Sequence, residues 1–208
     1  MDWKKRRWIG YILVTVVFCI ICLTFLWKPG IPVQDPSVLN EKLKSRIGRV
    51  IGPQSRVVYL HLDGLGASEK FRYAIVRYFA PGEVQSRHVS LYIDGSGKSF
   101  DLDSGPDSDG VTAGDGIPLN DLDFSVIATN VKRIRDLFME EGKTWMGVSE
   151  YVIRYDPAAG EFVHETEIWH EEGSVPFKWL VQYLSSVTPG EKVPYTIRQN
   201  GTGPLEKK

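Results

Sequence analysis

The most apolar stretch of the chain is a run of 20 uncharged residues from Trp8 to Trp27, WIGYILVTVVFCIICLTFLW. As a helix that rises about 1.5 Å per residue, this run spans about 30 Å, the thickness of the hydrocarbon core of a bilayer. The basic cluster KKRR at positions 4 to 7 favours a cytoplasmic N-terminus. Thr24, Phe25, Leu26 and Trp27, which follow the apolar core, are not the small residues expected before a signal-peptide cleavage site. The pattern therefore predicts a cytoplasmic tail at 1–7 and a retained transmembrane helix at 8–27 in the inner or plasma membrane, with the rest of the chain extracytoplasmic.

After this span, the polarity pattern changes to that of a folded domain. Three prolines in KPGIPVQDP, residues 28–36, end the transmembrane helix and predict a short stalk. Asp35 is placed to cap a helix that continues to about Ile51, with apolar residues at helical spacing on one side. Gly52 and Pro53 then end it.

Runs rich in β-branched and aromatic residues follow, separated by Gly, Pro, Asp and Ser. They predict strands at 56–62, 71–79, 88–93 and 98–102. The acidic, glycine-rich stretch 101–123 is too polar to build core and predicts a long surface loop. Apolar positions spaced by three and four then predict an amphipathic helix at 124–141.

The last third predicts a hairpin, a helix and an extended segment. The hairpin consists of WMGVSEYVIRY, the turn DPAAG and EFVHETEIWH, residues 145–170. A helix is expected at 176–186, an extended segment at 193–199, and a flexible C-terminus at 201–208. Strands that cluster in runs predict an α+β fold, in which one domain at 37–200 has a mainly antiparallel sheet packed against two or three helices. Each half offers a helix followed by strands, which suggests a duplicated unit, although no residue-level repeat supports it.

Composition restricts the function of this outer part. Its 181 residues, 28–208, suit one domain, and both cysteines, Cys19 and Cys22, lie in the predicted span. Without the charged residues at positions 2 and 4–7, the 25 basic and 26 acidic residues of the chain become 21 and 25, a formal charge of −4. Nucleic-acid binders carry clustered positive charge, so no nucleic-acid partner is expected.

No residue pattern predicts catalysis or a resident cofactor. His164 and His170 share one face of a strand but lie about 20 Å apart, too far to ligate one metal, and we interpret both as strand-surface residues. The acidic loop invites a calcium hypothesis, but positions six and twelve counted from Asp101 are Pro106 and Thr112 instead of Gly and Glu. There is no nucleophile elbow, and thiol catalysis outside the membrane is excluded by the absence of cysteine. We therefore expect a protein that is not an enzyme and that needs no metal.

The remaining candidates for function are surfaces for a protein partner. Acidic residues of the loop can steer a basic partner, and the aromatic residues of the last third can anchor it. These partner-binding candidates are Asp107, Asp109, Asp115, Trp145, Trp169, Trp179 and Tyr183.

The run RIRDLFMEEGKTWMGVSEYVIRYDPAAGEFVHETEIWH, followed by FKWLVQYL, resembles the C-terminal half of the YezG-like immunity-protein family. The corresponding positions are Leu137, Phe138, Gly142, Trp145, Gly160, Phe162, Trp169, Trp179, Tyr183 and Leu184. The resemblance implies an antitoxin that sequesters a secreted toxin, although members of that family are small, soluble, cytoplasmic proteins without an anchor. The alternative is a structural or sensory subunit of an envelope complex, similar in outline to PepSY-type helix-plus-sheet domains.

Overall fold

A computed structural model describes residues 11–12, 14–19, 30–64, 69–102, 110–171, 191–198 and 205–207. Most of the predicted span 8–27, the middle of the acidic loop and the predicted helix 176–186 lie outside these residues. Of the span, residues 11–12 and 14–19 are helical, and their apolar side chains are exposed. Among the described residues, no helix is both long enough and apolar enough to cross a membrane.

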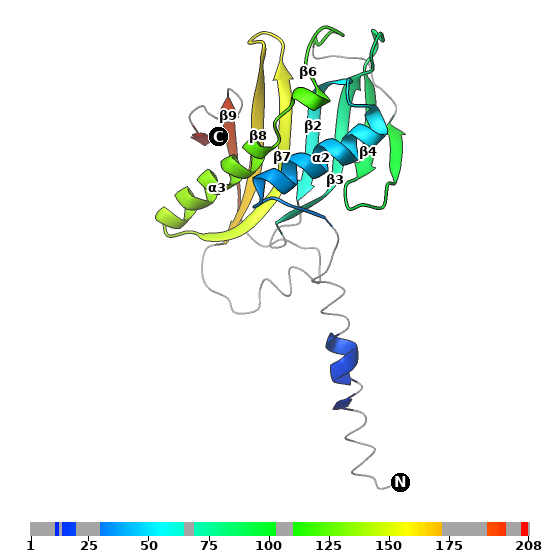
Figure 1. Cartoon of the computed structure of the whole chain (residues 1–208). Helices are drawn as coiled ribbons and strands as arrows, with labels where there is room; N and C mark the ends of the chain where they lie inside the picture. Colours follow the sequence, from blue (N-terminus) through cyan, green and yellow to red (C-terminus); the bar gives the residue numbers. More distant parts are fainter. Residues whose placement is uncertain are drawn as a thin grey trace, which may run out of the picture.

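One antiparallel sheet forms the framework of the domain (Figure 1). Its strand order is β10-β9-β8-β7-β2-β3-β4-β5, with two short strands beside this path: β1 pairs with β3 and β6 with β2. The strands are β1 (Ile31–Pro32), β2 (Arg56–Gly64), β3 (Lys70–Phe79), β4 (Arg87–Tyr92), β5 (Ser99–Leu102), β6 (Ile117–Pro118), β7 (Thr144–Asp156), β8 (Glu161–Glu171), β9 (Glu191–Arg198) and β10 (Leu205–Lys207). The predicted α+β fold with a mainly antiparallel sheet is confirmed.

Helix α2 (Pro36–Ile51) forms as the sequence predicts. The Asp35 carboxylate accepts a hydrogen bond from the backbone N–H of Val38 at 3.1 Å, and Pro36 occupies the first turn, where its missing N–H costs nothing. Leu39, Leu43, Ile47 and Ile51 recur every four residues and are buried. Gly52 ends the helix at φ 86°, a conformation that favours glycine.

Both described long helices, α2 and α3 (Ser125–Glu140), cover the same face of the sheet (Figure 1). Alternation along the strands turns Leu60, Leu62 and Ile153 toward the helices. The continuous core between the layers contains these side chains, the apolar stripes of both helices and the aromatic rings of Phe71, Phe124, Phe138, Tyr151 and Phe162.

The described domain consists of two halves with the same order of elements. Helix α2 precedes β2 to β5, helix α3 precedes β7 to β10, and the antiparallel pair β2–β7 joins the halves at the centre of the sheet. Leu60 pairs with Ile153 and Leu62 with Tyr151, and the pair His61–Val152 lies midway between them. A twofold axis between His61 and Val152 would exchange Leu60 with Tyr151. The same separation of 91 residues (151 − 60) relates the buried pairs Leu43 and Ile134, and Ile47 and Phe138. This order of elements is the one that a duplicated unit would give, and the duplication itself stays a prediction.

The predicted stalk, residues 28–36, is wrong for its last six residues, because 31–36 are part of the folded domain. Ile31 and Pro32 pair with Phe71 and Lys70 of β3, and the Val33 N–H donates to the Glu69 carbonyl at 2.9 Å. Because Ile31 and Val33 are apolar and find a pocket in the core, this part of the segment belongs to the domain. Likewise, residues 205–207 at the predicted flexible end pair with β9 as β10.

The predicted surface loop 101–123 is wrong in its second part, which contains regular structure and buried residues. Its second part contains β6 and the 3-10 helix η2 (Leu119–Asp121), and Leu119 and Leu122 are buried in the core. Gly116 makes this possible: it has φ 76°, and a Cβ there would lie 2.4 Å from the Val57 carbonyl oxygen. Leu119 and Leu122, with the half-buried Ile117, thus attach this part of the acidic stretch to the core beside β2.

Candidate functional site

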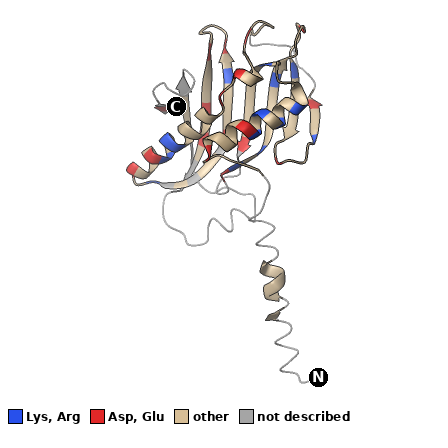
Figure 2. Cartoon of the chain, viewed as in Figure 1, with Lys and Arg blue, Asp and Glu red and all other residues tan. Residues whose placement is uncertain are grey.

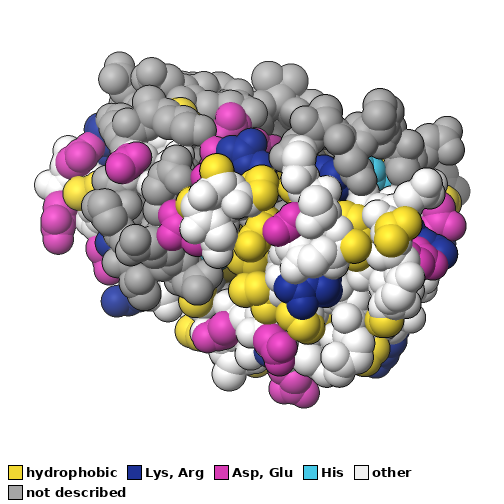
Figure 3. Space-filling model, turned by 90° about the horizontal axis from the view of Figure 1, so that it is seen from above, with side chains coloured by type: hydrophobic (Ala, Val, Ile, Leu, Met, Phe, Trp, Pro, Cys, Tyr) yellow, Lys and Arg dark blue, Asp and Glu magenta, His cyan; other side chains and the backbone are white. Residues whose placement is uncertain are grey.

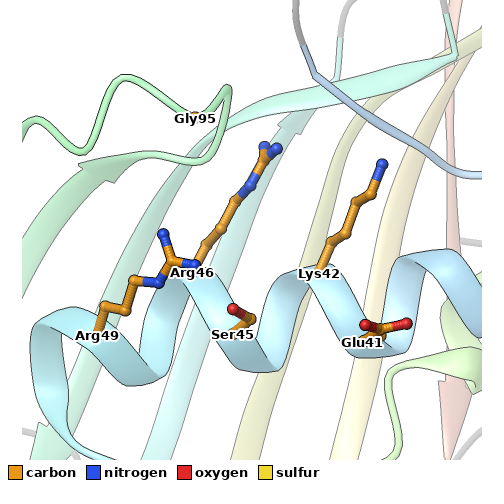
Figure 4. Close-up of a pocket in the computed structure, with 6 residues that line it drawn as sticks. All are labelled: Glu41, Lys42, Ser45, Arg46, Arg49 and Gly95. Carbon is orange, nitrogen blue, oxygen red and sulfur yellow. The ribbon is translucent and has the colours of Figure 1, made fainter.

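A cationic groove lies between α2 and the turn that connects β4 to β5. Two adjoining hollows of about 360 and 410 Å³ share Arg46, Arg49 and Gly95. The cations that line them are Lys42, Arg46, Arg49 and Lys98. We refer to these four residues and the turn 93–98 as the cationic groove. Lys42, Arg46 and Arg49 project from one side of the helix, with Gly95 in the turn that faces them (Figure 4).

The helix itself aligns these charges. Lys42 and Arg46 are four residues apart and Arg46 and Arg49 three apart, so they form a stripe beside the buried stripe of Leu43 and Ile47. Like charges at these spacings destabilise a helix by about 0.2–0.5 kcal/mol per pair. Helix α2 carries four cations and a single carboxylate, Glu41, whereas α3 carries three cations and two carboxylates, Asp136 and Glu140 (Figure 2). An anion bound in the groove would relieve this repulsion.

The opposite wall of the groove is held by its own hydrogen bonds. The Asp94 carboxylate accepts from the Ser96 N–H at 2.8 Å, and Gly95 and Gly97 adopt positive φ angles of 99° and 70°. Burial alone would raise the pKa of Asp94, but the hydrogen bonds from Ser96 and the charges of Arg72 and Arg46 lower it overall. Asp94 is therefore ionised, and its carboxylate is held within the turn by the hydrogen bond from Ser96.

Arg46 is the central cation of the groove. Burial is the main reason that the pKa of Arg46 is lowered, and the nearby charge of Arg49 adds to this effect while Asp94 opposes it. Arg46 Nη1 is shielded from solvent and has no hydrogen-bond partner, and the same is true of Nε of Arg72 behind the turn. No carboxylate among the described residues lies within 4.0 Å of the Arg46 or Arg49 guanidinium. Guanidinium groups remain protonated and present a planar fork of donors, so this arrangement can bind phosphate or carboxylate oxygens.

The described residues at the opposite end of the domain carry charges of both signs (Figure 3). Viewed from above, its charged side chains of both signs are scattered among apolar and uncharged atoms (Figure 3). In the groove, by contrast, four cations surround two adjoining hollows.

The residues predicted for partner binding are not brought together in the described part of the chain. Asp115 closes a local turn: its carboxylate accepts from the Thr112 N–H at 2.6 Å and from the Thr112 hydroxyl at 2.8 Å, and these bonds lower its pKa. Trp145 donates from Nε1 to Glu69 at 2.5 Å and packs edge-on against Phe138. Asp107, Asp109, Trp179, Tyr183 and the side chain of Trp169 lie outside the described residues.

The expectation that His164 is a strand-surface residue is wrong. Its side chain faces the helices, only 5 % exposed, and Nδ1 lies 3.0 Å from the Tyr151 hydroxyl. That hydroxyl also accepts a hydrogen bond from Nδ2 of Asn130 at 2.8 Å. Burial lowers the pKa of His164 to about 4 and raises that of Tyr151 well above its ordinary value. Strand alternation gives the residues that share a face with His164 but does not tell which face the helices cover.

On the face of the sheet away from the helices, His61 Nε2 and Glu150 Oε2 lie 3.2 Å apart, in an orientation that does not make a hydrogen bond. Burial raises the pKa of the neighbouring Asp63, and the Glu150 charge adds to this effect. Within the described ranges, no group of three or more His, Cys, Asp or Glu side chains is arranged to hold a metal ion.

The sequence contained one signal for the groove, namely the cations at 42, 46 and 49 on a predicted helix. That signal is ambiguous, since such a stripe is usually solvated. Lys98 and the Asp94 turn join it only through the tertiary fold. No family model, curated protein or solved structure matches the chain.

Proposed function

We propose that this chain is a membrane-tethered binding protein of the cell envelope, whose extracytoplasmic domain holds an anionic group in the cationic groove. The carrying observation is the cluster of Lys42, Arg46, Arg49 and Lys98 around two adjoining hollows. The uncharged segment 8–27 and its basic flank supply the tether. Tethering raises the local concentration of the domain at the membrane, which strengthens capture without new contacts.

The resemblance to YezG-like immunity proteins supports a specific version of this proposal. In that version the anionic group belongs to a toxin, and the domain sequesters it at the membrane surface. The groove then selects an acidic surface on the toxin, whereas the acidic loop residues Asp107 and Asp109 would attract a basic one. The two surfaces predict toxins of opposite charge.

The alternative is a subunit of an envelope complex, and one observation favours it. Strand β5 forms the edge of the β2-side half of the sheet, and Phe100 is 56 % exposed on it beside Tyr92, at a ring separation of 6.4 Å. Exposed aromatic residues at a sheet edge are a common means of contact between proteins.

The binding proposal is tested with the full chain in neutral detergent micelles and inorganic pyrophosphate as the probe. A ligand at ten times its Kd stabilises the folded state by about 1.4 kcal/mol, a rise in Tm of about 3–6 °C for a domain of this size. We expect this rise for the natural chain and its loss in the double variant Arg46→Ala/Arg49→Ala.

The matched control is Lys132→Ala/Arg133→Ala, which removes two cations from α3 and should keep the rise. An equal rise in Tm for the natural chain and the groove variant would show that pyrophosphate acts elsewhere and would refute the proposal.

A further inference from the structure

The position of the cationic groove relative to the start of the domain suggests its occupant. Gly30 packs so closely on β3 that a Cβ there would lie 3.0 Å from the Lys70 Cβ and 3.2 Å from the Arg72 Cγ. The next residue, Ile31, pairs with Phe71. The chain therefore joins the domain against Lys70 and Arg72.

The same strand residues hold the turn of the groove. The Arg72 carbonyl accepts a hydrogen bond from the Ile93 N–H at 2.8 Å, and the Arg72 charge acts on Asp94. The turn 93–98 is thus attached to the residue next to the point where the chain joins the sheet. The groove and this junction lie at the same end of the domain.

This end lies close to the bilayer if residues 8–27 form the tether, so the inference rests on the proposed function. Three residue steps separate Trp27 from Gly30. At about 3.5 Å per fully extended residue they reach at most about 10 Å. The headgroup layer beyond the hydrocarbon core is itself roughly 5–7 Å thick on each side. Gly30 consequently lies within or just above the layer of phospholipid headgroups.

The charge at this end suits an anionic lipid surface. Lys42, Arg46, Arg49, Lys70, Arg72 and Lys98 contribute six positive charges. Four carboxylates lie among them: Glu41 lines the groove, Asp94 belongs to its turn, Glu69 precedes Lys70, and Asp63 interacts with the Arg72 charge, so the six cations exceed these carboxylates by two. Lys42 and Arg49 are exposed, while the more shielded Arg46 has a guanidinium nitrogen without a partner.

We propose that the cationic groove binds the phosphate groups of anionic phospholipids in the same membrane that anchors the chain, and so holds the domain against the bilayer. The exposed cations contact headgroups at the surface, and Arg46 receives one phosphate inside the groove. Each Lys or Arg near an anionic surface contributes about fivefold to binding, so the loss of two weakens docking about 25-fold.

The test uses the full chain in nanodiscs of phosphatidylcholine alone and of phosphatidylcholine mixed with phosphatidylglycerol. The readout is hydrogen–deuterium exchange of the backbone amides of residues 93–99. We expect phosphatidylglycerol to slow this exchange in the natural chain and in Lys132→Ala/Arg133→Ala, and to have no effect in Arg46→Ala/Arg49→Ala. Exchange that is the same in both kinds of disc would overturn the proposal.

A third arm adds inorganic pyrophosphate to the natural chain in discs of phosphatidylcholine alone. If pyrophosphate slows exchange there while phosphatidylglycerol does not, the groove serves a soluble anion, and the lipid assignment fails while the proposed function stands. If neither ligand has an effect, both fail. A chain that does not incorporate into discs would instead remove the tether on which the inference depends.

Discussion

Replacement of His164 by Gln should change how the stability of the domain depends on pH. The imidazole lies in the core, its Nδ1 facing the Tyr151 hydroxyl at 3.0 Å. Because that hydroxyl accepts from Asn130, its own proton is available to donate to Nδ1 of a neutral imidazole. Protonation of Nδ1 would place two hydrogen-bond donors, the imidazole N–H and the Tyr151 O–H, against each other in a buried site.

The size of the effect follows from the two pKa values. Burial lowers the pKa of His164 from its ordinary 6.5 to about 4. Between these values the unfolded chain binds more protons at this residue than the folded chain, so stability rises with pH. The contribution is complete above about pH 6.5 and is lost progressively as the pH falls toward 4. From about pH 7.5 to about pH 5 the loss amounts to roughly 2 kcal/mol.

The assay is urea unfolding of the full chain in neutral micelles, followed by tryptophan fluorescence across this pH range. Other titrating groups affect the natural chain and the His164→Gln variant alike, so the difference between the two isolates residue 164. The free energy of unfolding of the natural chain should fall by about 2 kcal/mol more than that of the variant. Parallel curves would show that His164 is protonated equally in both states, and would refute the buried neutral imidazole.

Three further substitutions test the packing, each by urea unfolding. Gly116→Ala should lower the free energy of unfolding by about 2–4 kcal/mol, because residue 116 has a left-handed conformation and a Cβ there would lie 2.4 Å from the Val57 carbonyl oxygen. The control Gly114→Ala should change it by no more than about 0.5 kcal/mol, since the nearest atom to a Cβ there is 3.9 Å away. Tyr151→Phe should cost about 2 kcal/mol, since it leaves the buried Asn130 amide without its acceptor; an unchanged stability would contradict this network. Leu43→Ala should lower the free energy of unfolding by about 2–5 kcal/mol, because the shorter side chain leaves a cavity in the core. A smaller loss would mean that α2 is loosely packed at this position.

Local elements of this fold were predictable because their determinants are local. Asp35, Pro36 and Gly52 mark the ends of the first helix in the sequence, and the structure places α2 between them. The hairpin turn at 156–160 was also predictable from its glycine, and Gly160 adopts a positive φ angle in the structure. Strand bounds agree to within about two residues in β2, β3, β4, β7 and β8, where apolar alternation is regular.

Long-range relations were not predictable by the same means. No pattern in β2 predicts that β7 is one of its neighbours, or that the helices cover the face bearing His164. The same limit applies to the groove, since Lys98 and Arg46 are 52 positions apart (98 − 46) and meet only when α2 lies beside the β4–β5 turn. The acidic stretch shows a further limit, because average polarity concealed the single apolar residues Leu119 and Leu122 that enter the core.

The paired halves of the domain provide an internal comparison for its surface chemistry. With the separation of 91 residues that relates Leu60 to Tyr151, Lys42 corresponds to Arg133, Arg46 to Leu137 and Arg49 to Glu140. Two buried positions are apolar in both helices, Leu43 with Ile134 and Ile47 with Phe138, whereas Leu39 corresponds to Asn130. On the polar side, three cations correspond to one cation, one leucine and one carboxylate. The two halves therefore share a framework but differ in surface charge, and exchanging these three residues between α2 and α3 would move the charge from one side of the domain to the other.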